Sequence, residues 1–215
     1  LQEPLRMVSS YTQLLHKKYK DQLDEKAQKY IHYAVDGAVR MQRLINDLLQ
    51  YSRINTRGKE FVPVDLHSCL GQALVNLGHT IEENQAVVTN DELPELPVDS
   101  TQMIQLFQNL IGNSIKFRSE KPPHIHISAK KEGEGWCFRV KDNGIGIDDA
   151  YKNRIFEIFQ RLHNRQSYPG TGIGLAICNR IVQRHGGKIT VESKLGEGST
   201  FVFNLPVSQG KDGGK

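Results

Sequence analysis

Apolar residues recur at helical spacing in the N-terminal part of the chain. Between residues 24 and 54 they alternate steps of four and three, which is a heptad pattern sustained for three repeats, at Ala27, Ile31, Ala34, Ala38, Met41, Ile45 and Leu48. Residues 1–19 carry a comparable stripe, at Leu1, Leu5, Val8, Leu15 and Tyr19. The polar segment 19–22 between the two patterns is typical of a turn. The sequence therefore predicts an antiparallel helical hairpin over residues 1–55.

The two predicted helices carry more apolar surface than they can bury against each other. A second copy of the hairpin would cover both stripes by completing a four-helix bundle. We therefore predict a homodimer that forms through residues 1–55. The alternative is a hairpin that packs within its own chain on the domain that follows.

A different pattern begins after the polar, glycine-containing segment 56–60, which we interpret as a linker. Strands are predicted at 61–64, 86–89, 124–130, 136–141, 188–192 and 200–205, and helices at 66–77, 100–117 and 174–185. Asp65 is expected to cap the first of these helices, and Asp99 or Ser100 the second. Because helices and strands arrive in blocks with hairpin-type turns, the expected fold is α+β, a layered sandwich over residues 61–207. Residues 208–215 are expected to form an unstructured tail.

Composition narrows the class of protein without identifying it. Of the 215 residues, 38% are hydrophobic and 24% charged, which is ordinary for a globular protein with a packed core. The net charge of +4 is scattered along the chain, so no nucleic-acid partner is expected. Cys69, Cys137 and Cys178 lack metal-site spacing and favour a reducing compartment. Without a long apolar run or a signal peptide, we expect a cytoplasmic protein that does not insert into a membrane.

Two asparagines and a lysine share one face of the predicted helix that ends at Phe117. Asn109 and Asn113 are four residues apart, and Lys116 lies one turn beyond Asn113. Amide oxygens are neutral, hard ligands that can take one or two positions on a hydrated magnesium ion. Lys116 would then pair with a phosphate. The alternative is that the two asparagines merely cap neighbouring loops.

A carboxylate follows a predicted strand and precedes the glycine turn Asn143-Gly144-Ile145-Gly146-Ile147. Asp142 at this position can accept a hydrogen bond from an exocyclic amine such as that of adenine, and it would not accept one from the oxygen of guanine. The glycines would let a flat base lie close. Asp-Asn-Gly is also a common turn sequence, so the turn alone has a purely structural alternative.

A second glycine segment, Gly170-Thr171-Gly172-Ile173-Gly174-Leu175, stands just ahead of a predicted helix. Backbone N–H groups and the positive end of the helix would face a phosphate there. The pattern is neither a Walker loop nor a Rossmann fingerprint. Between the two glycine segments, Phe156 and Phe159 are expected to anchor a mobile lid. Its basic side chains that could reach phosphates are Arg161, His163 and Arg165, although at least one is expected to be solvated surface charge.

These motifs together resemble those of sensor histidine kinases. The segments 109–117, 142–147, 156–159 and 170–175 look like that family's N, first glycine, F and second glycine boxes, and segments 1–6 and 47–53 look like the two ends of its dimerisation hairpin. Phe159-Gln160-Arg161-Leu162-His163 is most similar to phytochrome-type members. The resemblance implies a two-layer α/β sandwich of the Bergerat (GHKL) type, with ATP and Mg²⁺ as cofactors.

The resemblance also implies a set of site residues. Lys116 and Asn113 are expected to be catalytic, and Asn109 and Asn113 to hold the metal. The expected ATP-binding set is Asn109, Asn113, Lys116, Phe117, Asp142, Gly144, Gly146, Ile147, Arg161, Gly170, Thr171, Gly172, Gly174 and Leu175.

Two positions depart from the family pattern. In these kinases the phosphate-accepting histidine lies two residues before the leucine that Leu1 matches, so the acceptor is expected to be missing from this sequence. His16 and His32 lie on the hairpin outside that motif, and we interpret them as surface histidines. Glu3 stands where members with phosphatase activity resemble one another in carrying Thr or Asn, so dephosphorylation of a partner is not expected.

The function expected from the resemblance is that of a two-component kinase core. Such a core transfers the γ-phosphoryl of ATP to a histidine on the dimerisation helix and then to an aspartate of a response-regulator receiver domain. This chain is expected to bind ATP without phosphorylating itself. The alternative is a nucleotide-binding dimeric scaffold without phosphotransfer. An ATPase related to chaperones or topoisomerases is disfavoured by the heptad hairpin and by Asn109, which replaces the general-base glutamate of those relatives.

Overall fold

The computed structural model describes residues 2–56, 58–162, 168 and 170–207. The chain divides into two compact units, Leu1–Gln50 and Tyr51–Lys215. The predicted tail 208–215 lies outside the described residues. Each unit has its own architecture, and each is described below by itself.

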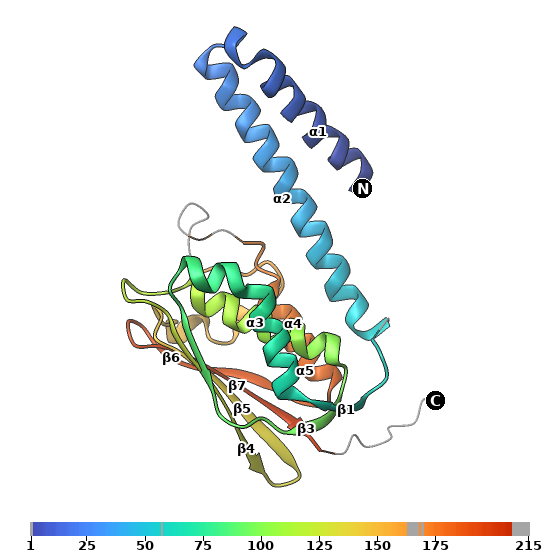
Figure 1. Ribbon diagram of the computed structural model, residues 1–215, viewed down its shortest axis with the longest axis vertical. Helices are drawn as coiled ribbons and strands as arrows, with labels where there is room; N and C mark the ends of the chain where they lie inside the picture. The colour runs from blue at the N-terminus through green and yellow to red at the C-terminus, as the bar shows by residue number, and fades with distance from the viewer. Residues whose placement is uncertain (1, 57, 163–167, 169, 208–215) are drawn as a thin grey trace. The chain divides into compact units, whose positions relative to one another are not determined.

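The first unit is a helical hairpin, as predicted (Figure 1). Helix α1 spans Gln2–Tyr19, the short 3₁₀ helix η1 spans Lys20–Gln22, and α2 spans Glu25–Thr56. The Asp24 carboxylate accepts a hydrogen bond from the backbone N–H of Ala27 at 2.7 Å and so caps the start of α2. At the other end of the hairpin, Gln2 Nε2 donates to Asn46 Oδ1 at 2.8 Å. The Gln2–Asn46 hydrogen bond joins the start of α1 to the later part of α2, as the antiparallel arrangement requires.

The hairpin buries little of its apolar surface within one chain. No residue of α1 is buried, and within residues 25–50 of α2 the buried hydrophobic residue is Ala38. Large apolar side chains stand exposed along both helices, namely Met7, Val8, Tyr11, Leu14, Leu15, Tyr19, Tyr30, Tyr33, Met41, Leu48 and Leu49. Of the predicted stripes, Val8, Leu15, Tyr19, Met41 and Leu48 are exposed, whereas Ala38 is buried and Ile31 and Ile45 are half-buried, so the stripes are only partly covered in the single chain.

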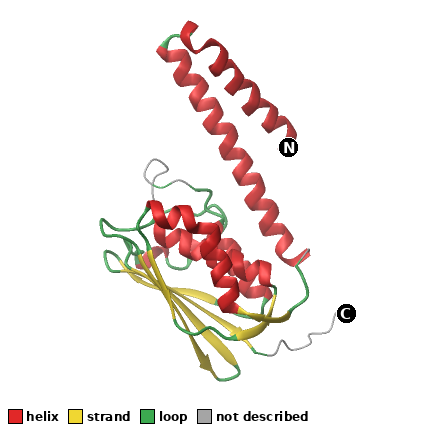
Figure 2. Ribbon diagram, viewed as in Figure 1, coloured by secondary structure: helices red, strands yellow, loops and turns green. Residues whose placement is uncertain are grey.

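The second unit is an α+β sandwich, in agreement with the predicted fold class (Figure 2). Its main sheet has five strands in the order β2-β4-β5-β7-β6. The bounds are Val87–Asn90 for β2, His124–Glu132 for β4, Gly135–Asp142 for β5, Gly198–Pro206 for β7 and Ile189–Lys194 for β6. The β2–β4 pair is parallel and the other pairs are antiparallel. A separate antiparallel pair joins β1, Val62–Asp65, to β3, Glu95–Val98.

Helices cover one face of the main sheet (Figure 2). They are α3 at Leu66–Glu83, α4 at Ser100–Lys116 and α5 at Gly174–Arg184, and two short 3₁₀ helices, η2 at Asp149–Tyr151 and η3 at Arg154–Phe156, precede α5. The side chains of Phe138 and Phe203 on neighbouring strands stack with ring centroids 4.8 Å apart, and both are fully buried. Opposite them, α4 contributes Met103, Leu106, Phe107, Leu110 and Ile111 to the same core.

The capping residues predicted from the sequence mark the starts of α3 and α4 correctly. The carboxylate of Asp65 accepts from the N–H groups of His67 and Ser68, and that of Asp99 accepts from those of Thr101 and Gln102, so both predicted N-caps are confirmed. The end of α3 was predicted wrongly, because the helix continues through Gly78 to Glu83.

Strand β3 was not predicted. Its segment contains Pro97 and follows Pro94, and proline removes a backbone donor from a strand. The strand pairs with β1 alone. Pro97 stands opposite Pro63 in this pair, so the two residues that lack a backbone N–H face each other and the remaining residues can pair.

Within the second unit, the end of α2 and the linker are held by Asp99, Gln102 and Arg184, and His185 supports Asp99. We call these four side chains the linker clamp. Asp99 Oδ2 accepts from the backbone N–H of Lys59 at 2.7 Å and from Arg184 Nη1 at 3.0 Å. Arg184 Nη2 donates to the carbonyl oxygen of Lys59 at 2.6 Å, and Gln102 Nε2 donates to that of Ile54 at 3.0 Å. The last turn of α2 and the linker are therefore held by the start of α4 and the end of α5.

His185 completes the linker clamp from within the core. Its Nε2 accepts from the backbone N–H of Asp99 at 3.1 Å, and its Nδ1–H donates to the carbonyl oxygen of Ile181 at 2.8 Å. Burial lowers the pKa of His185 to about 4, with a smaller contribution from the charge of Arg184 in the same direction. The ring is therefore neutral at physiological pH, as these two hydrogen bonds require.

Candidate functional site

Asp142 lies at the end of β5 with its carboxylate oriented by three donors. Oδ1 accepts from the backbone N–H groups of Gly144 at 2.9 Å and Ser199 at 3.0 Å, and Oδ2 accepts from Ser114 Oγ at 3.1 Å. The residue is only 7% exposed. Burial raises the pKa of Asp142 above its ordinary value, and the three hydrogen bonds act against that rise. The carboxylate is thus a fixed acceptor in a poorly solvated place.

The first glycine turn is packed tightly between the end of α4 and the turn that joins β6 to β7. The N–H of Ile145 donates to the carbonyl oxygen of Phe117 at 3.0 Å, and a Cβ on Gly144 would come within 2.5 Å of that oxygen. Gly146 has a φ of 72° and lies against the carbonyl group of Lys194. Both glycines are therefore required by the chain's own packing, in addition to any approach of a flat ligand.

The face of α4 that carries Asn109 and Asn113 lies next to the start of α5. Asn109 Nδ2 donates to the carbonyl oxygen of Gly174 at 3.3 Å, and Asn109 Oδ1 accepts from Gln105 Nε2 at 3.3 Å. Asn113 follows one turn later and is half-buried. The two amides thus lie on one face, as their spacing predicts, and at least one of them reaches the second glycine segment.

Two cationic side chains meet at the second glycine segment. Arg161 donates from Nη1 to the carbonyl oxygen of Gly170 at 2.6 Å and from Nη2 to that of Tyr168 at 2.8 Å. Lys116 Nζ lies 2.6 Å from the position that a Cβ of Gly170 would take. Burial lowers the pKa of Lys116, and the nearby charge of Arg161 lowers it further. Two positive groups that are held close together in this way favour an anionic ligand between them.

The aromatic ring of Phe117 borders the same place. The Lys116 ammonium lies 4.4 Å from the centroid of this ring, and the ring of Tyr168 lies 5.0 Å from it. Helix α5 begins at Gly174 after Ile173, whose side chain supplies no capping hydrogen bond. Because the first backbone N–H groups of a helix have no intrahelical partner, this end of α5 is suited to an anion. Thr171, Gly172 and Leu175 occupy the same segment and are half-buried, as is Ile147 in the first glycine turn.

The segment between the two glycine motifs was expected to be anchored by two aromatic residues, and one of them does not do so. The side chain of Phe159 is 57% exposed, so it does not anchor the segment within this chain. Ile155 is the buried residue there, and the N–H of Phe159 donates to the carbonyl oxygen of Gly172 at 3.0 Å. The predicted phosphate contacts His163 and Arg165 lie outside the described residues.

Three serines at the site were missed by the sequence analysis. Ser114 and Ser199 hold the Asp142 carboxylate, and Ser193 Oγ accepts from the N–H of Ile147 at 2.8 Å. Ser193 Oγ also lies 3.0 Å from Ser199 Oγ, so the two hydroxyls join β6 to β7 beside the first glycine turn. Serines carry no spacing signal of their own, because the sheet brings these residues together from distant parts of the chain.

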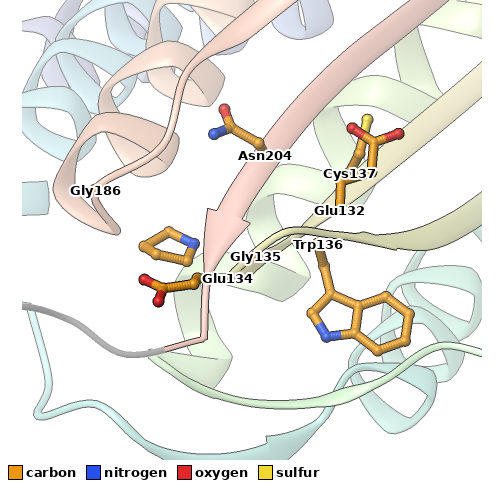
Figure 3. Close-up of a pocket in the computed structure, with 8 residues that line it drawn as sticks. Glu132, Glu134, Gly135, Trp136, Cys137, Gly186 and Asn204 are labelled. Carbon is orange, nitrogen blue, oxygen red and sulfur yellow. The ribbon is translucent and has the colours of Figure 1, made fainter.

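A pocket of about 310 Å³ lies away from these residues, at the other end of β5 (Figure 3). Its lining residues are Glu132, Glu134, Gly135, Trp136, Cys137, Gly186, Asn204 and Pro206. Gly135 begins β5 and Asp142 ends it, which places the two about 23 Å apart at the usual rise of a strand. None of the predicted site residues lines this pocket.

Two family models match the chain. The model described as "Histidine kinase-, DNA gyrase B-, and HSP90-like ATPase" matches residues 98–209, which include every predicted nucleotide-binding residue. The model described as "His Kinase A (phospho-acceptor) domain" matches residues 1–57. The chain belongs to the sensor histidine kinase family. The resemblance inferred from the sequence is thus confirmed.

Among similar curated proteins are phytochromes of cyanobacteria. Cyanobacterial phytochrome A of Nostoc sp. is 53% identical over 96% of this chain and 27% of its own length. Phytochrome-like protein Cph1 of Synechocystis sp. is 47% identical over 96% of this chain and 28% of its own length. The chain therefore spans about a quarter of the length of these relatives, and its likeness to phytochrome-type kinases is confirmed.

Solved histidine kinase structures share the fold. Full-length ShkA, crystallised in complex with AMPPNP, has a TM-score of 0.71 and 26% identity, covering 97% of this chain and 44% of ShkA. The catalytic domain of histidine kinase ThkA has a TM-score of 0.60 and 26% identity, covering 69% of this chain and 97% of that domain. In the part of the chain that the structure describes, no helix has the length and apolar character needed to cross a membrane.

Proposed function

We propose that this chain is the kinase core of a two-component sensor. Its second unit would bind Mg-ATP, and the γ-phosphoryl would pass to a histidine of the dimerisation helices and then to a response-regulator aspartate. The observation that carries the proposal is the pairing of an oriented, buried acceptor, Asp142, with a cationic segment formed by Lys116, Arg161 and the start of α5. An adenine nucleotide needs both an acceptor for its amine and cations for its phosphates.

Asp142 would select the base. Oδ1 already accepts two backbone N–H groups and Oδ2 accepts one hydroxyl, so Oδ2 has room for one more donor. The exocyclic amine of adenine is such a donor. Burial raises the pKa of Asp142, and the hydrogen bonds from Gly144, Ser199 and Ser114 oppose that rise by favouring the ionised, accepting form.

The phosphates would lie between Lys116, Arg161 and the N–H groups at the start of α5. In the transfer step, a histidine nitrogen forms a bond to the γ-phosphorus while the bond from that phosphorus to the bridging oxygen breaks, and ADP leaves. Charge develops on the phosphoryl and leaving oxygens, where a lysine and backbone N–H groups are most effective. Lys116 and Asn113 are therefore the residues that we propose as catalytic.

The amides of Asn109 and Asn113 fit a magnesium ion. Asn109 Oδ1 accepts one hydrogen bond, from Gln105, and an amide oxygen has capacity for two partners. Bound magnesium would supply neutralisation of the phosphate charge and would retain several waters, so that one or two protein oxygens suffice. Within the residues that the structure describes, no group of three or more His, Cys, Asp or Glu is placed to hold a metal ion.

The hairpin would supply a dimer interface and a docking site for a response-regulator receiver domain. Family membership and the uncovered apolar side chains of α1 and α2 support the dimer. Because ATP and response regulators are cytoplasmic, we propose the same location for this chain. His16 and His32 lie outside the motif of an acceptor histidine, so the chain of residues 1–215 should bind ATP without becoming phosphorylated.

Calorimetry with Mg-ADP tests the site, and labelled ATP tests the reaction. D142N should weaken ADP binding by at least about tenfold, because it removes a charged acceptor that is worth roughly 1.5–3 kcal/mol. D149N changes an exposed aspartate on η2 and should bind ADP as the unchanged chain does. Incubation with γ-labelled ATP should leave residues 1–215 unlabelled and should label a longer version that is extended before Leu1 with an acceptor histidine. Acid-labile label on residues 1–215 would refute the predicted lack of an acceptor, and ADP binding without label on the longer version would favour the scaffold.

A further inference from the structure

Ser114 is a buried hydroxyl that contacts the acceptor of the proposed nucleotide site. It is 3% exposed, lies on the last turn of α4, and has two acceptors within reach. Ser114 Oγ is 3.1 Å from Asp142 Oδ2 and also 3.1 Å from the carbonyl oxygen of Leu110. A serine hydroxyl has one proton, so it can donate fully to one of these two oxygens at a time.

The charge on Asp142 decides between the two acceptors. Hydrogen bonds to an ionised carboxylate are about twice as strong as those between neutral groups, so the Ser114 proton turns to Oδ2 while Asp142 is ionised. If Asp142 took up a proton, that proton would reside on Oδ2, because Oδ1 is already occupied by the N–H groups of Gly144 and Ser199. Ser114 would then donate to Leu110 and could accept from the carboxylic acid.

The two states of Asp142 recognise different bases. The ionised form only accepts, and so it fits an exocyclic amine. The protonated form can donate from Oδ2, and so it fits a carbonyl oxygen at the same ring position. Ser114 is the one side-chain donor among the three donors to Asp142 that the structure describes, since the other two are backbone groups.

We propose that Ser114 is a positioning residue that sets base specificity: by donating to Asp142 Oδ2 it holds the carboxylate as a pure acceptor and favours a 6-amino purine over a 6-oxo purine. This inference rests on the proposed function, in which Asp142 faces the base. Burial works in the opposite direction by favouring the protonated form of Asp142. The groups that act on this carboxyl in the structure are Ser114 from α4, Gly144 from the glycine turn and Ser199 from β7.

The test compares ADP with inosine diphosphate, which carries a carbonyl in place of the 6-amine, on the full chain by calorimetry. The unchanged chain should prefer ADP. In S114A, ADP should bind about 3- to 10-fold more weakly, as expected for loss of one hydrogen bond, while inosine diphosphate should bind equally or more tightly. The pH below which ADP binding declines should also rise. S114T keeps the hydroxyl and should retain the preference.

Matched controls separate the possible outcomes. S128A removes a serine hydroxyl from β4 on the opposite face of the sheet, and both affinities should remain unchanged. An equal loss of both affinities in S114A, with the ratio and pH profile unchanged, would overturn the proposal by giving Ser114 a merely structural role. If S114A does not fold, S114C replaces the hydroxyl with a weak donor, and an unchanged ratio there overturns the proposal equally. Failure of the unchanged chain to bind ADP would instead refute the proposed function.

Discussion

The two units of this chain bury their apolar residues in different ways. In the second unit, side chains as large as Phe107, Phe138 and Phe203 are fully buried by helices on one face of a sheet. In the first unit, α1 buries no residue and Leu48 and Met41 remain about half exposed. The second unit therefore contains its own core, whereas Ala38 is the one buried hydrophobic residue in the described part of the first unit.

The two units differ in burial because the second has two packed layers, helices on a sheet, and the first has a single layer of two helices. A helix laid on a sheet is covered on its apolar side and covers the sheet in return, so a single chain closes the core. Two helices form one layer, and each has an apolar stripe wider than its contact with the other. If the first unit dimerises as proposed, we expect its stability to depend on protein concentration and that of the second unit not to.

The strongest way to break this comparison is L48E, which places a charge on the uncovered stripe of α2. A buried leucine contributes about 1.5–3 kcal/mol, and a symmetric dimer loses it twice, so the loss is about 3–6 kcal/mol. The dimer dissociation constant should rise more than a hundredfold. Sedimentation at several concentrations measures it. V75E on α3 changes an equally apolar but 74% exposed residue of the second unit and should leave the dimer intact; a dimer that persists in L48E would remove this face of α2 from the interface.

The substitution F138A should destabilise the second unit. It removes a fully buried ring that stacks on Phe203, and such truncations cost about 3–5 kcal/mol. Urea unfolding followed by the fluorescence of Trp136, which lies on the same strand, should shift to a lower midpoint. Sedimentation should still show a dimer. Loss of the dimer in parallel with the urea shift would show that the two units do not fold independently.

The buried His185 predicts a pH dependence for the second unit. Its pKa is about 4 when folded and 6.5 when unfolded, so below pH 6.5 the unfolded chain binds a proton that the folded chain does not. Stability should therefore fall as the pH drops from about 6.5 to about 4, with a loss of about 2 kcal/mol at pH 5. Urea midpoints at pH 7 and pH 5 measure this loss. H185Q keeps every other titrating group, so an equal loss in that variant would count against His185 as the cause.

The smallest expected effect is a stabilisation of the second unit by a substitution in α3. Gly71 lies inside α3, and a Cβ there would meet nothing within 4 Å. G71A should raise the stability of the second unit by about 0.5–1 kcal/mol, because glycine loses more backbone entropy in a helix than alanine does. The urea midpoint should increase while the dimer dissociation constant stays the same. A decrease in the midpoint would mean that the exposed face of α3 depends on the glycine.

Sequence reasoning succeeded where the signal was local. The heptad pattern defined the hairpin, and Asp65 and Asp99 marked helix starts because an N-cap bonds to groups two or three residues away. It failed where pairing is distant, since β3 carries prolines that only its partner β1 makes acceptable.

The candidate site shows the same division. The two glycine turns and the asparagine face could be predicted because each lies within a few residues of sequence. Ser114, Ser193 and Ser199 could not, because their partners Asp142 and Ile147 are 28, 46 and 57 residues distant. Such contacts depend on strand order and register, which local patterns do not encode.

The linker clamp has a consequence for joining this domain to other proteins. The last turn of α2 supplies the carbonyl of Ile54 to Gln102, and Lys59 supplies both of its backbone groups to Asp99 and Arg184. A chimera that replaces Ile54 and Lys59 would leave the buried side chains of Asp99 and Gln102 without these partners. A splice within residues 48–50 of α2, which are exposed, would carry the whole clamp with the domain, and the heptad phase of the two helices would have to be matched there.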